Sequence, residues 1–559
     1  MKKLLLASAS AVAILTTPVF AQNNSTVTQS NQYNEAEVTQ DGTNATSTVN
    51  QSGNGTSADR ANEVRVDQSG DGAEAVVTQS GSDRNDAQVD QDGDSYASIT
   101  QAGTSQEAEI WQDGDANVAT IDQAGNSNQV GNALNGGPAM VSGIVQAGDA
   151  NTATIDQNPA AYSSALVDQF GDGNTATVQQ EQNGGAGVNR TSADVAQTGD
   201  LNTATVTQNT DFNNASNDAF VTQTGNSNNA TVTQSGPQNT GTINQLADGN
   251  LATITQEDDS GGTATINQTD DNNEANVTQT AASALATVNQ SGTGNLANLS
   301  QGRTSGTQYQ TNSQEALITQ TGHNNEVDAS QSGSSGDLNV LQSGNTNFAS
   351  VNQSGFANNA GDDAATAGVI QSGSDNDAYI TQSGQLSDAF VEQIGDFNTG
   401  TINQSVNNAP NPVGGPDPLV ATASLTQGGS TNTGTIAQFG GDGTRSARLM
   451  DATLNQGGDG NTATISQTND LIDSDYSGNF ANVSQSGNGN GSTLTQNGVD
   501  NSATVVQSGD GNTSLIGQAG SDLSAFVTQS GSGNLSTVNQ SGSDNAATVT
   551  QSGGGFINN

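Results

Sequence analysis

The chain has 559 residues, of which 30% are hydrophobic and 3% aromatic, so it lacks the residues for a conventional thick apolar core. It carries 56 Asp and Glu against nine Lys and Arg, a formal net charge of −47, and it contains no Cys and one His. This composition excludes disulfide bridges, zinc, haem or iron–sulfur centres, and the basic surface that nucleic acids or anionic membranes require. We therefore predict no cofactor and no nucleic-acid partner.

The first 21 residues have the pattern of a secretory signal peptide. Lys2 and Lys3 precede an apolar stretch from Leu4 to Leu15 that is too short to span a bilayer, and a cleavage site is expected after Ala21. Cleavage would leave seven Arg, no Lys and a net charge of −49. We expect residues 1–21 to be removed on export, and we predict no transmembrane segment in residues 22–559.

The mature sequence repeats one short unit, N-x-A-x-V-x-Q, usually followed by Gly two residues later. Marking each closing Gln gives 43 units from Gln29 to Gln551, of which the one ending at Gln310 is doubtful, and 28 of the 42 spacings are 11 residues. Because the same unit resumes after every insertion, we expect one repeat region over residues 22–559. Insertions rich in Gly, Asn and Asp precede Gln68, Gln146, Gln197, Gln223, Gln371, Gln427, Gln456 and Gln485, and the segment 407–418, with four Pro residues, is the most loop-like.

Within each unit the small apolar residues alternate with polar ones, which is the period of a β-strand and not of a helix. About four residues remain for each link, enough for a hairpin or for an arc that carries the chain into a facing sheet. We favour the arc, because two facing sheets bury the recurring Ala and Val face on both sides. The sequence therefore predicts an all-β, two-sheet β-solenoid of the cross-β type, with about 22 residues per rung and roughly 21 rungs.

Asn and Gln recur at the two ends of every predicted strand. A buried amide is costly when it has no partner, but stacked copies of one amide can donate to the next rung and accept from the previous one. We therefore predict structural amide ladders, for example at Asn117, Gln123, Asn151, Gln157, Asn202, Gln208, Asn545 and Gln551. Glycines that allow a tight arc are predicted at Gly42, Gly53, Gly81, Gly103, Gly125 and Gly542.

The string Q-x-G-x-x-N-x-A-x-V-x-Q resembles the curlin repeat of bacterial curli subunits. It is clearest at 146–157 and 540–551 and weaker at 40–51, and the resemblance extends over nearly all of the mature chain. It implies a secreted structural subunit that leaves the cell through the periplasm and polymerises by edge templating into extracellular amyloid fibres. The implied roles are in the biofilm matrix and in adhesion, and the implied partners are other copies of the chain, a nucleator subunit and an outer-membrane secretion pore.

Other interpretations of the sequence stay open at this point. Outward Thr pairs such as Thr152 and Thr154 fit a monomeric solenoid that binds ice or acts as a surface adhesin. Asp-rich turns such as 171–174 and 509–512 suggest weak, diffuse Ca²⁺ binding without a formed metal site. His323 follows a turn Gly and no carboxylate pair is singled out, so we predict no enzyme activity. Outward aromatic residues are candidates for adhesion or lateral bundling; they are Trp111, Phe220, Tyr379, Phe390 and Phe526.

Overall fold

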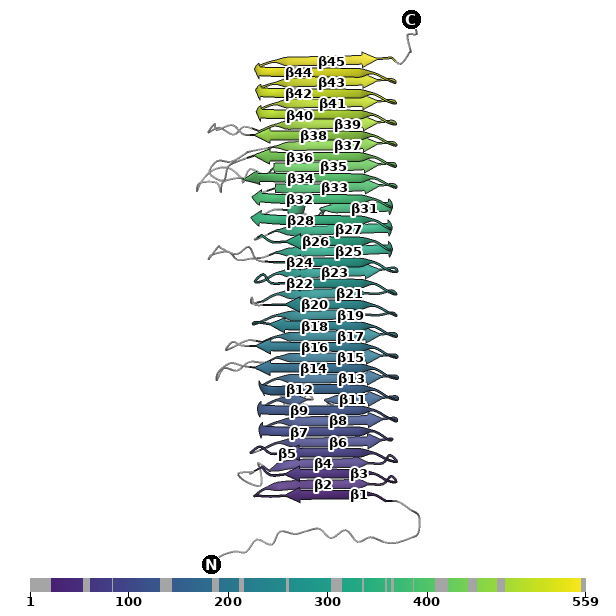
Figure 1. Cartoon of the computed structure of the whole chain (residues 1–559), viewed down its shortest axis with the longest axis vertical. Helices are drawn as coiled ribbons and strands as arrows, with labels where there is room; N and C mark the ends of the chain where they lie inside the picture. Colours follow the sequence, from purple (N-terminus) through teal and green to yellow (C-terminus); the bar gives the residue numbers. More distant parts are fainter. Residues whose placement is uncertain are drawn as a thin grey trace, which may run out of the picture.

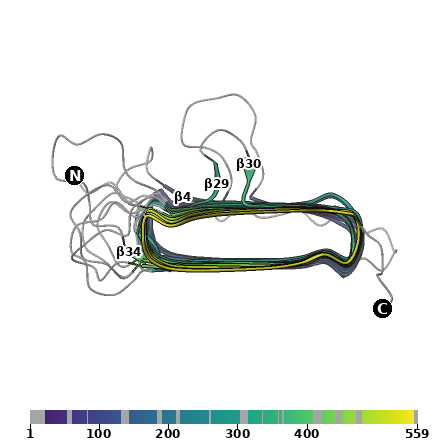
Figure 2. The same ribbon diagram turned by 90° about the horizontal axis from the view of Figure 1, so that it is seen from above.

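The computed structural model is a flattened β-solenoid in which two parallel sheets face each other and successive turns stack along one axis (Figures 1 and 2). This confirms the predicted fold class. The structure describes residues 22–53, 61–82, 84–130, 143–182, 191–210, 216–257, 261–302, 314–333, 336–356, 359–362, 366–385, 387–407, 421–440, 450–469 and 478–553. The predicted signal peptide, residues 1–21, and most of the predicted loop 407–418 lie outside these residues.

One face of the solenoid, sheet A, contains 21 strands. They are β1 (Asn24–Gln29), β3 (Thr46–Gln51), β5 (Glu74–Gln79), β7 (Tyr96–Thr104), β9 (Val118–Asn126), β12 (Thr152–Ala161), β14 (Thr175–Gln182), β16 (Thr203–Thr210), β18 (Asn229–Ser235), β20 (Leu251–Gln256), β22 (Glu274–Gln279), β24 (Leu296–Gln301), β26 (Glu326–Gln331), β28 (Phe348–Phe356), β32 (Asp377–Gln385), β34 (Thr399–Asn407), β36 (Thr433–Gly440), β38 (Thr462–Asn469), β40 (Gly491–Val499), β42 (Thr513–Ser521) and β44 (Leu535–Ser543).

The facing sheet, sheet B, is stacked in the same way. Its strands β10 and β11 both pair with β8, so they form one turn together, and β29 and β31 likewise both pair with β27. The short β30 pairs antiparallel with β29. Its strands are β2 (Asn34–Gln40), β4 (Asn62–Gln68), β6 (Asp86–Asp92), β8 (Glu107–Asp113), β10 (Gln129–Val130), β11 (Ile144–Ala147), β13 (Ser164–Phe170), β15 (Ser192–Thr198), β17 (Asp218–Thr224), β19 (Thr240–Gln245), β21 (Thr263–Gln268), β23 (Leu285–Ser291), β25 (Glu315–His323), β27 (Asp337–Asn345), β29 (Asn359–Asp362), β30 (Thr366–Ala367), β31 (Val369–Ser374), β33 (Ser387–Ile394), β35 (Ala421–Gly428), β37 (Asp451–Gly457), β39 (Phe480–Ser486), β41 (Ser502–Ser508), β43 (Ser524–Ser530) and β45 (Ala546–Ser552).

Equivalent residues of successive turns lie over one another. In β14 and β16, for example, Ala176 pairs with Ala204, Val178 with Val206 and Gln180 with Gln208. The inward Ala, Val, Ile and Leu side chains of both sheets form one continuous buried cluster along the stack. A shift by one residue would turn this face to solvent, so the period-2 pattern fixes the register.

The two arcs that join the sheets differ in sequence. The arc from sheet B to sheet A, which we call the plain arc, carries none of the predicted insertions. Six of the eight insertions fall between a sheet A strand and the next sheet B strand, and the other two interrupt a sheet B strand, between β10 and β11 and between β29 and β31. The predicted insertions therefore fall in the other arc or within sheet B, and none falls in the plain arc.

The core of the last three sheet A strands is imperfect. Ser492, Ser514 and Ser536 occupy the position that Ala takes in most strands, and their buried hydroxyls have no hydrogen-bond partner. We expect Ser514→Ala to increase the free energy of unfolding by about 1 kcal/mol, because a buried hydroxyl without a partner costs about 1–3 kcal/mol. Hydrogen exchange of β40–β44 would measure this gain, and the exposed Ser502→Ala in β41 is the matched control. Equal protection in both variants would contradict the prediction.

Candidate functional site

The closing Gln of each turn donates a hydrogen bond to the closing Gln of the next turn. In sheet A this ladder runs without a break from Gln29 to Gln540, with Nε2–Oε1 distances of 2.7–3.0 Å. A second ladder runs through sheet B from Gln40 to Gln551 over the same range of distances. Both ladders pass over the doubtful unit, since Gln301 donates directly to Gln331 and Gln290 to Gln320.

The ladder glutamines after the first turn also connect the two sheets. The Nε2 group of Gln123 in β9 donates to the carbonyl of Glu107 at the start of β8, at 3.0 Å, and to Gln157 at 2.9 Å. The same bond to a carbonyl 16 residues earlier recurs along the stack, as from Gln208 to Ser192 and from Gln551 to Leu535. One amide therefore links neighbouring turns and facing sheets, and the repeat spacing did not predict this second role.

The asparagines beside the plain arc form amide-to-amide ladders over part of the stack, as predicted, and they also pair with backbone groups. Asn202 donates to Asn174 and Asn174 to Asn151, and the same Nδ2–Oδ1 bond runs without a break from Asn273 to Asn534. The Oδ1 of Asn117 accepts the backbone N–H of Asn151 at 2.9 Å, and its Nδ2 donates to the carbonyl of Gly148 in the plain arc at 2.7 Å. Asn202 is arranged in the same way, with its Nδ2 2.8 Å from the carbonyl of Gly225. Asn545, in the last turn, is exposed and donates to Ser541. The Asn side chains therefore hold the plain arc and, where they bond to one another, also connect neighbouring turns.

Most of the predicted turn glycines are required by the close stacking of the arcs. A Cβ atom on Gly42, Gly53, Gly81, Gly103 or Gly125 would overlap with the backbone carbonyl of the residue in the next turn. Gly103 and Gly125 also have positive φ angles, of 157° and 117°. Gly542 has a φ of 93° but lies in the last turn, where nothing crowds a side chain. Among these six glycines, steric contact between turns is therefore a more common requirement than a positive φ angle.

The Asp side chains of the plain arc accept hydrogen bonds from backbone N–H groups of neighbouring turns. Asp172 Oδ1 accepts the N–H of Asp149 at 2.8 Å, and Asp200 Oδ1 accepts the N–H of Asp172 at 2.9 Å. The same contact occurs between Asn488 and Asp510. Among the described residues no group of three or more His, Asp or Glu side chains has the geometry to hold a metal ion. Weak, diffuse Ca²⁺ binding by these turns stays a prediction.

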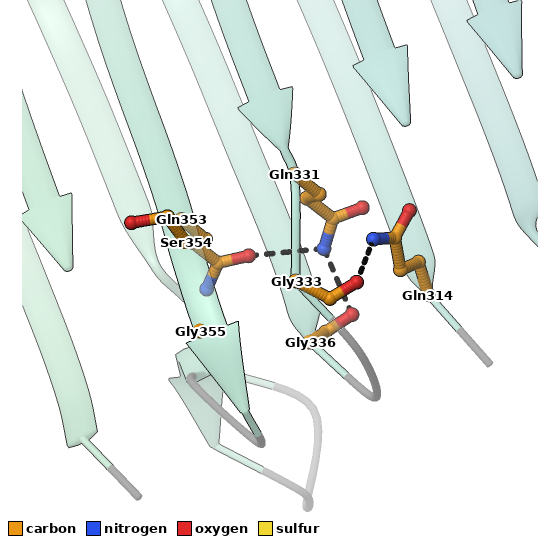
Figure 3. A pocket seen from close by; sticks show the side chains of 7 residues that line it. All are labelled: Gln314, Gln331, Gly333, Gly336, Gln353, Ser354 and Gly355. Atoms are coloured by element: carbon orange, nitrogen blue, oxygen red, sulfur yellow. Dashed lines mark hydrogen bonds between the residues drawn. The ribbon is translucent and has the colours of Figure 1, made fainter. Parts of the chain in front are cut away.

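A local defect interrupts the column of Asn positions that lies beside the insertions (Figure 3). Gln314 takes an Asn position of sheet B, and the next turn has Gly336 there, so the buried Oε1 of Gln314 has no partner. Its Nε2 donates to the carbonyl of Gly333, beside a cavity of about 10 Å³, close to the lower limit for one water molecule. Next to this cavity Gln331 still donates to Gln353 at 2.9 Å. The Gln ladder therefore continues where the Asn column fails.

Several outward carboxylates of sheet B are held in an environment that disfavours charge. Burial, with the nearby Glu63 and Glu109, raises the pKa of Asp86 to about 6. Burial and the neighbouring Asp194 likewise raise the pKa of Asp168 to about 6. The parallel register adds to the effect of burial on these pKa values, because it places acidic residues of successive turns near one another with few cations to balance them.

These pKa values predict that the solenoid is more stable in mild acid. A carboxyl whose pKa is higher in the folded state than in the unfolded state binds protons on folding. Its stabilising contribution is therefore complete below about pH 4 and is lost as the pH rises through about 6. We expect the urea midpoint to be higher at pH 5 than at pH 8, and Asp168→Asn to reduce that difference. A midpoint that rises with pH would contradict this.

The remaining predicted residues lie apart from one another. Trp111 is half-buried on the outer face of β8, and Phe220, Phe390 and Phe526 lie on the outer face of sheet B. Tyr379 lies on sheet A and packs beside Phe348, with ring centroids 5.7 Å apart. The exposed His323 ends β25 in the plain arc. The described residues contain no helix that is long and apolar enough to cross a membrane.

The sequence matches the family model described as the Curlin associated repeat. The matches cover residues 60–93, 94–125, 107–131, 215–236, 344–384, 498–531 and 522–553. They therefore occur near both ends of the described stack and in its middle. No curated protein matches the chain. The matched segments contain strands of both sheets and glutamines of both Gln ladders.

Proposed function

We propose, on the premise that this chain belongs to the curlin family of repeat proteins, that it is a structural subunit which polymerises end to end into extracellular fibres. The subunit would be exported by its signal peptide through the periplasm and an outer-membrane pore. Copies of the chain, seeded by a nucleator subunit, would then build curli-like amyloid of the biofilm matrix. The role is structural and involves no catalysis.

The direction of the Gln ladders carries this proposal. Every ladder Gln donates toward the C-terminal end of the stack, so the ladders begin at Gln29 and Gln40 and end at Gln540 and Gln551. A second copy placed on the C-terminal end would present the oxygens of Gln29 and Gln40 to the amide nitrogens of Gln540 and Gln551. Each contact would thus extend both ladders, both sheets and the apolar core by one molecule.

The first and last turns expose side chains at core positions, and stacking of a second copy would bury them. All six residues of β1 are exposed, and Val27, at a core position, is 46% exposed. At the other end β45 is exposed at alternate residues, and Val549 is only partly buried. Unpaired strand edges are templates for another chain. Electron microscopy of the aged, purified chain tests the proposal: fibres with strands perpendicular to their axis are expected, and a stable monomer on size exclusion would contradict it.

A stable monomer would instead favour the ice-binding or adhesin interpretation. Thr120, Thr154, Thr177, Thr205, Thr231 and Thr253 form one outward column on six successive strands of sheet A. The column ends at β22, where Asn276 takes the Thr position, and Asn298 and Asp328 follow it. Ice-recrystallisation assays on the monomer would separate this second candidate from fibre formation.

Fibre growth should be strongly salt-dependent. The mature chain carries a net charge of −49, spread over turns about 4.8 Å apart, so an incoming copy is repelled. Raising ionic strength from 0.01 M to 0.1 M shortens the screening length from about 30 Å to about 10 Å. We expect thioflavin-detected elongation to accelerate roughly tenfold or more over this range, and Ca²⁺ to act in the same direction. A rate that is flat or falls with salt would count against templated stacking of the acidic copies.

A further inference from the structure

The outer face of sheet A has a hollow of about 370 Å³ between β22 and β28. One outward column supplies Asn276, Asn298, Asp328 and Ser350, and Ser300 and Ser330 lie in the next column. Four successive strands place these groups over a length of about 14 Å along the stack. Amide, hydroxyl and carboxylate side chains line the hollow together with Leu299, Ala329 and Val351, and no basic residue is among its lining residues.

Hydrogen bonds between the strands hold the amides of this hollow in place. Asn276 Nδ2 donates to Asn298 Oδ1 at 3.1 Å, and Asn298 Nδ2 donates to Asp328 Oδ1 at 2.9 Å. Asn276 uses its second N–H on Glu274 Oε1, at 3.0 Å, whereas Asn298 has one N–H group beyond its bond to Asp328, and the amide and carboxylate oxygens have further acceptor positions. Groups fixed in this way lose little freedom when a ligand binds.

An aromatic pair stands at the end of the hollow. Tyr379 of β32 pairs in register with Ser350, so its ring occupies the next position of the same outward column. Phe348 of β28 packs against it with the rings inclined by 53°. Tyr379 remains 38% exposed. An exposed ring face beside rows of amides and hydroxyls is suited to a ligand that has both apolar C–H faces and many hydroxyls.

We propose that this hollow binds a neutral polysaccharide chain lying along the stack. The inference rests on the proposed function and deepens it, because it names a class of partner for a matrix fibre. Sugar hydroxyls would pair with the Asn, Asp and Ser groups, and a sugar ring would stack on Tyr379. The strong negative charge of the chain, with Asp328 inside the hollow, selects a neutral polymer over an anionic one. The hollow extends over four strands, which fits a polymer better than a single small sugar.

Binding to microcrystalline cellulose, with anionic alginate beads as comparator, tests this inference on the full chain. We expect the wild type to bind cellulose and not alginate, and Tyr379→Ala and Asn298→Leu each to weaken cellulose binding at least tenfold. Phe390→Ala is the matched control, because Phe390 is an outward aromatic residue on β33, the next strand in sequence, but on the opposite sheet. It should bind like the wild type.

Three results would overturn the inference: no cellulose binding by the wild type, undiminished binding by Tyr379→Ala and Asn298→Leu, or equal loss in Phe390→Ala. Lateral bundling that depends on Tyr379 without cellulose binding would assign the hollow to a second copy instead, and would also overturn it. Fibre growth is measured on the same samples. Fibres that do not bind cellulose refute the polysaccharide site alone, whereas a cellulose-binding monomer refutes the proposed polymerisation and leaves the site intact.

Discussion

Replacing Gln256 by Leu should destabilise the middle of the solenoid by about 3–4 kcal/mol. The buried Gln256 accepts from Gln234 at 2.9 Å and donates to Gln279 at 2.8 Å, and it also reaches the carbonyls of Thr240 and Gly262. Leucine has a similar size but leaves several of these groups without a partner, and each buried unpaired group costs about 1–3 kcal/mol. Outward substitutions such as Thr255→Leu on the same strand should stay within about 0.5 kcal/mol.

Hydrogen exchange is the appropriate measurement, because each turn of a repeat protein contacts only its neighbours. We expect exchange in β18–β22 to be faster by roughly 140-fold to 700-fold, with the distant strands β40–β44 unchanged, since about 1.4 kcal/mol corresponds to a factor of ten. Gln256→Glu adds a second test: it should behave like Gln256→Leu at pH 7 and regain protection at pH 4, where a protonated carboxyl can again donate. Uniform protection in all variants would show that the ladder does not stabilise the stack.

The pattern of the sequence was sufficient to predict the turn of the solenoid. Val178 and Val206 lie over each other because every inward position repeats at the spacing of one turn, and a single unit already contains that alternation. The recurring Gln at the end of each unit predicted the amide ladder in the same way, because a buried amide needs a hydrogen-bond partner and the equivalent Gln of the next turn supplies one. The doubtful unit that ends at Gln310 lies outside the described residues, and the sheet A ladder joins Gln301 directly to Gln331.

The difference between the two arcs could not be predicted from single units. It appears only when alternate units are assigned to different sheets. Asn117 and Asn151 then belong to an Asn column next to the plain arc, whereas Gln314 and Gly336 stand in the interrupted column beside the insertions. Aligning the chain at two-unit spacing would have revealed this. The second bond of each Gln, to a carbonyl of the opposite sheet, depends on the distance between the sheets and needs coordinates.

The candidate binding surface also depends on this pairing of alternate units. Asn276, Asn298 and Asp328 lie in three consecutive units of sheet A, but in the sequence a sheet B unit separates each from the next. These residues are seen to be neighbours in one column only when the units of sheet A are considered apart from those of sheet B. Tyr379 and Phe390 likewise occupy equivalent positions in successive units, yet they face opposite sides of the molecule. The position of a residue within its unit predicts whether its side chain is exposed. Whether the unit belongs to sheet A or to sheet B decides on which side of the molecule that side chain lies.

The open edge of β45 allows a sharper experiment on polymerisation. The carbonyl of Asn545 accepts a hydrogen bond from the N–H of Ser524, and the N–H of Gly553 donates to the carbonyl of Ser530. The backbone N–H and C=O groups of alternate residues of β45 therefore point toward β43. Thr548, between Asn545 and Gly553, presents its N–H to the open edge. Thr548→Pro would remove that donor and obstruct an incoming strand while keeping the bonds to β43. We expect the variant to fold, with hydrogen exchange in β1–β43 unchanged, and to lose self-polymerisation at least a hundredfold, whereas Thr548→Val grows normally.

Head-to-tail contacts make the variant more informative than a simple loss of growth. Every contact between copies joins the C-terminal edge of one to the N-terminal edge of the other, so a chain of pure Thr548→Pro cannot form a single contact. Its N-terminal edge is intact, however, and can add to the C-terminal edge of a wild-type fibre, where it blocks the next addition. Small fractions of the variant should therefore stop growth at that end of wild-type seeds. Growth that continues at both ends, followed by fluorescence microscopy, would show that the chains do not stack in this order.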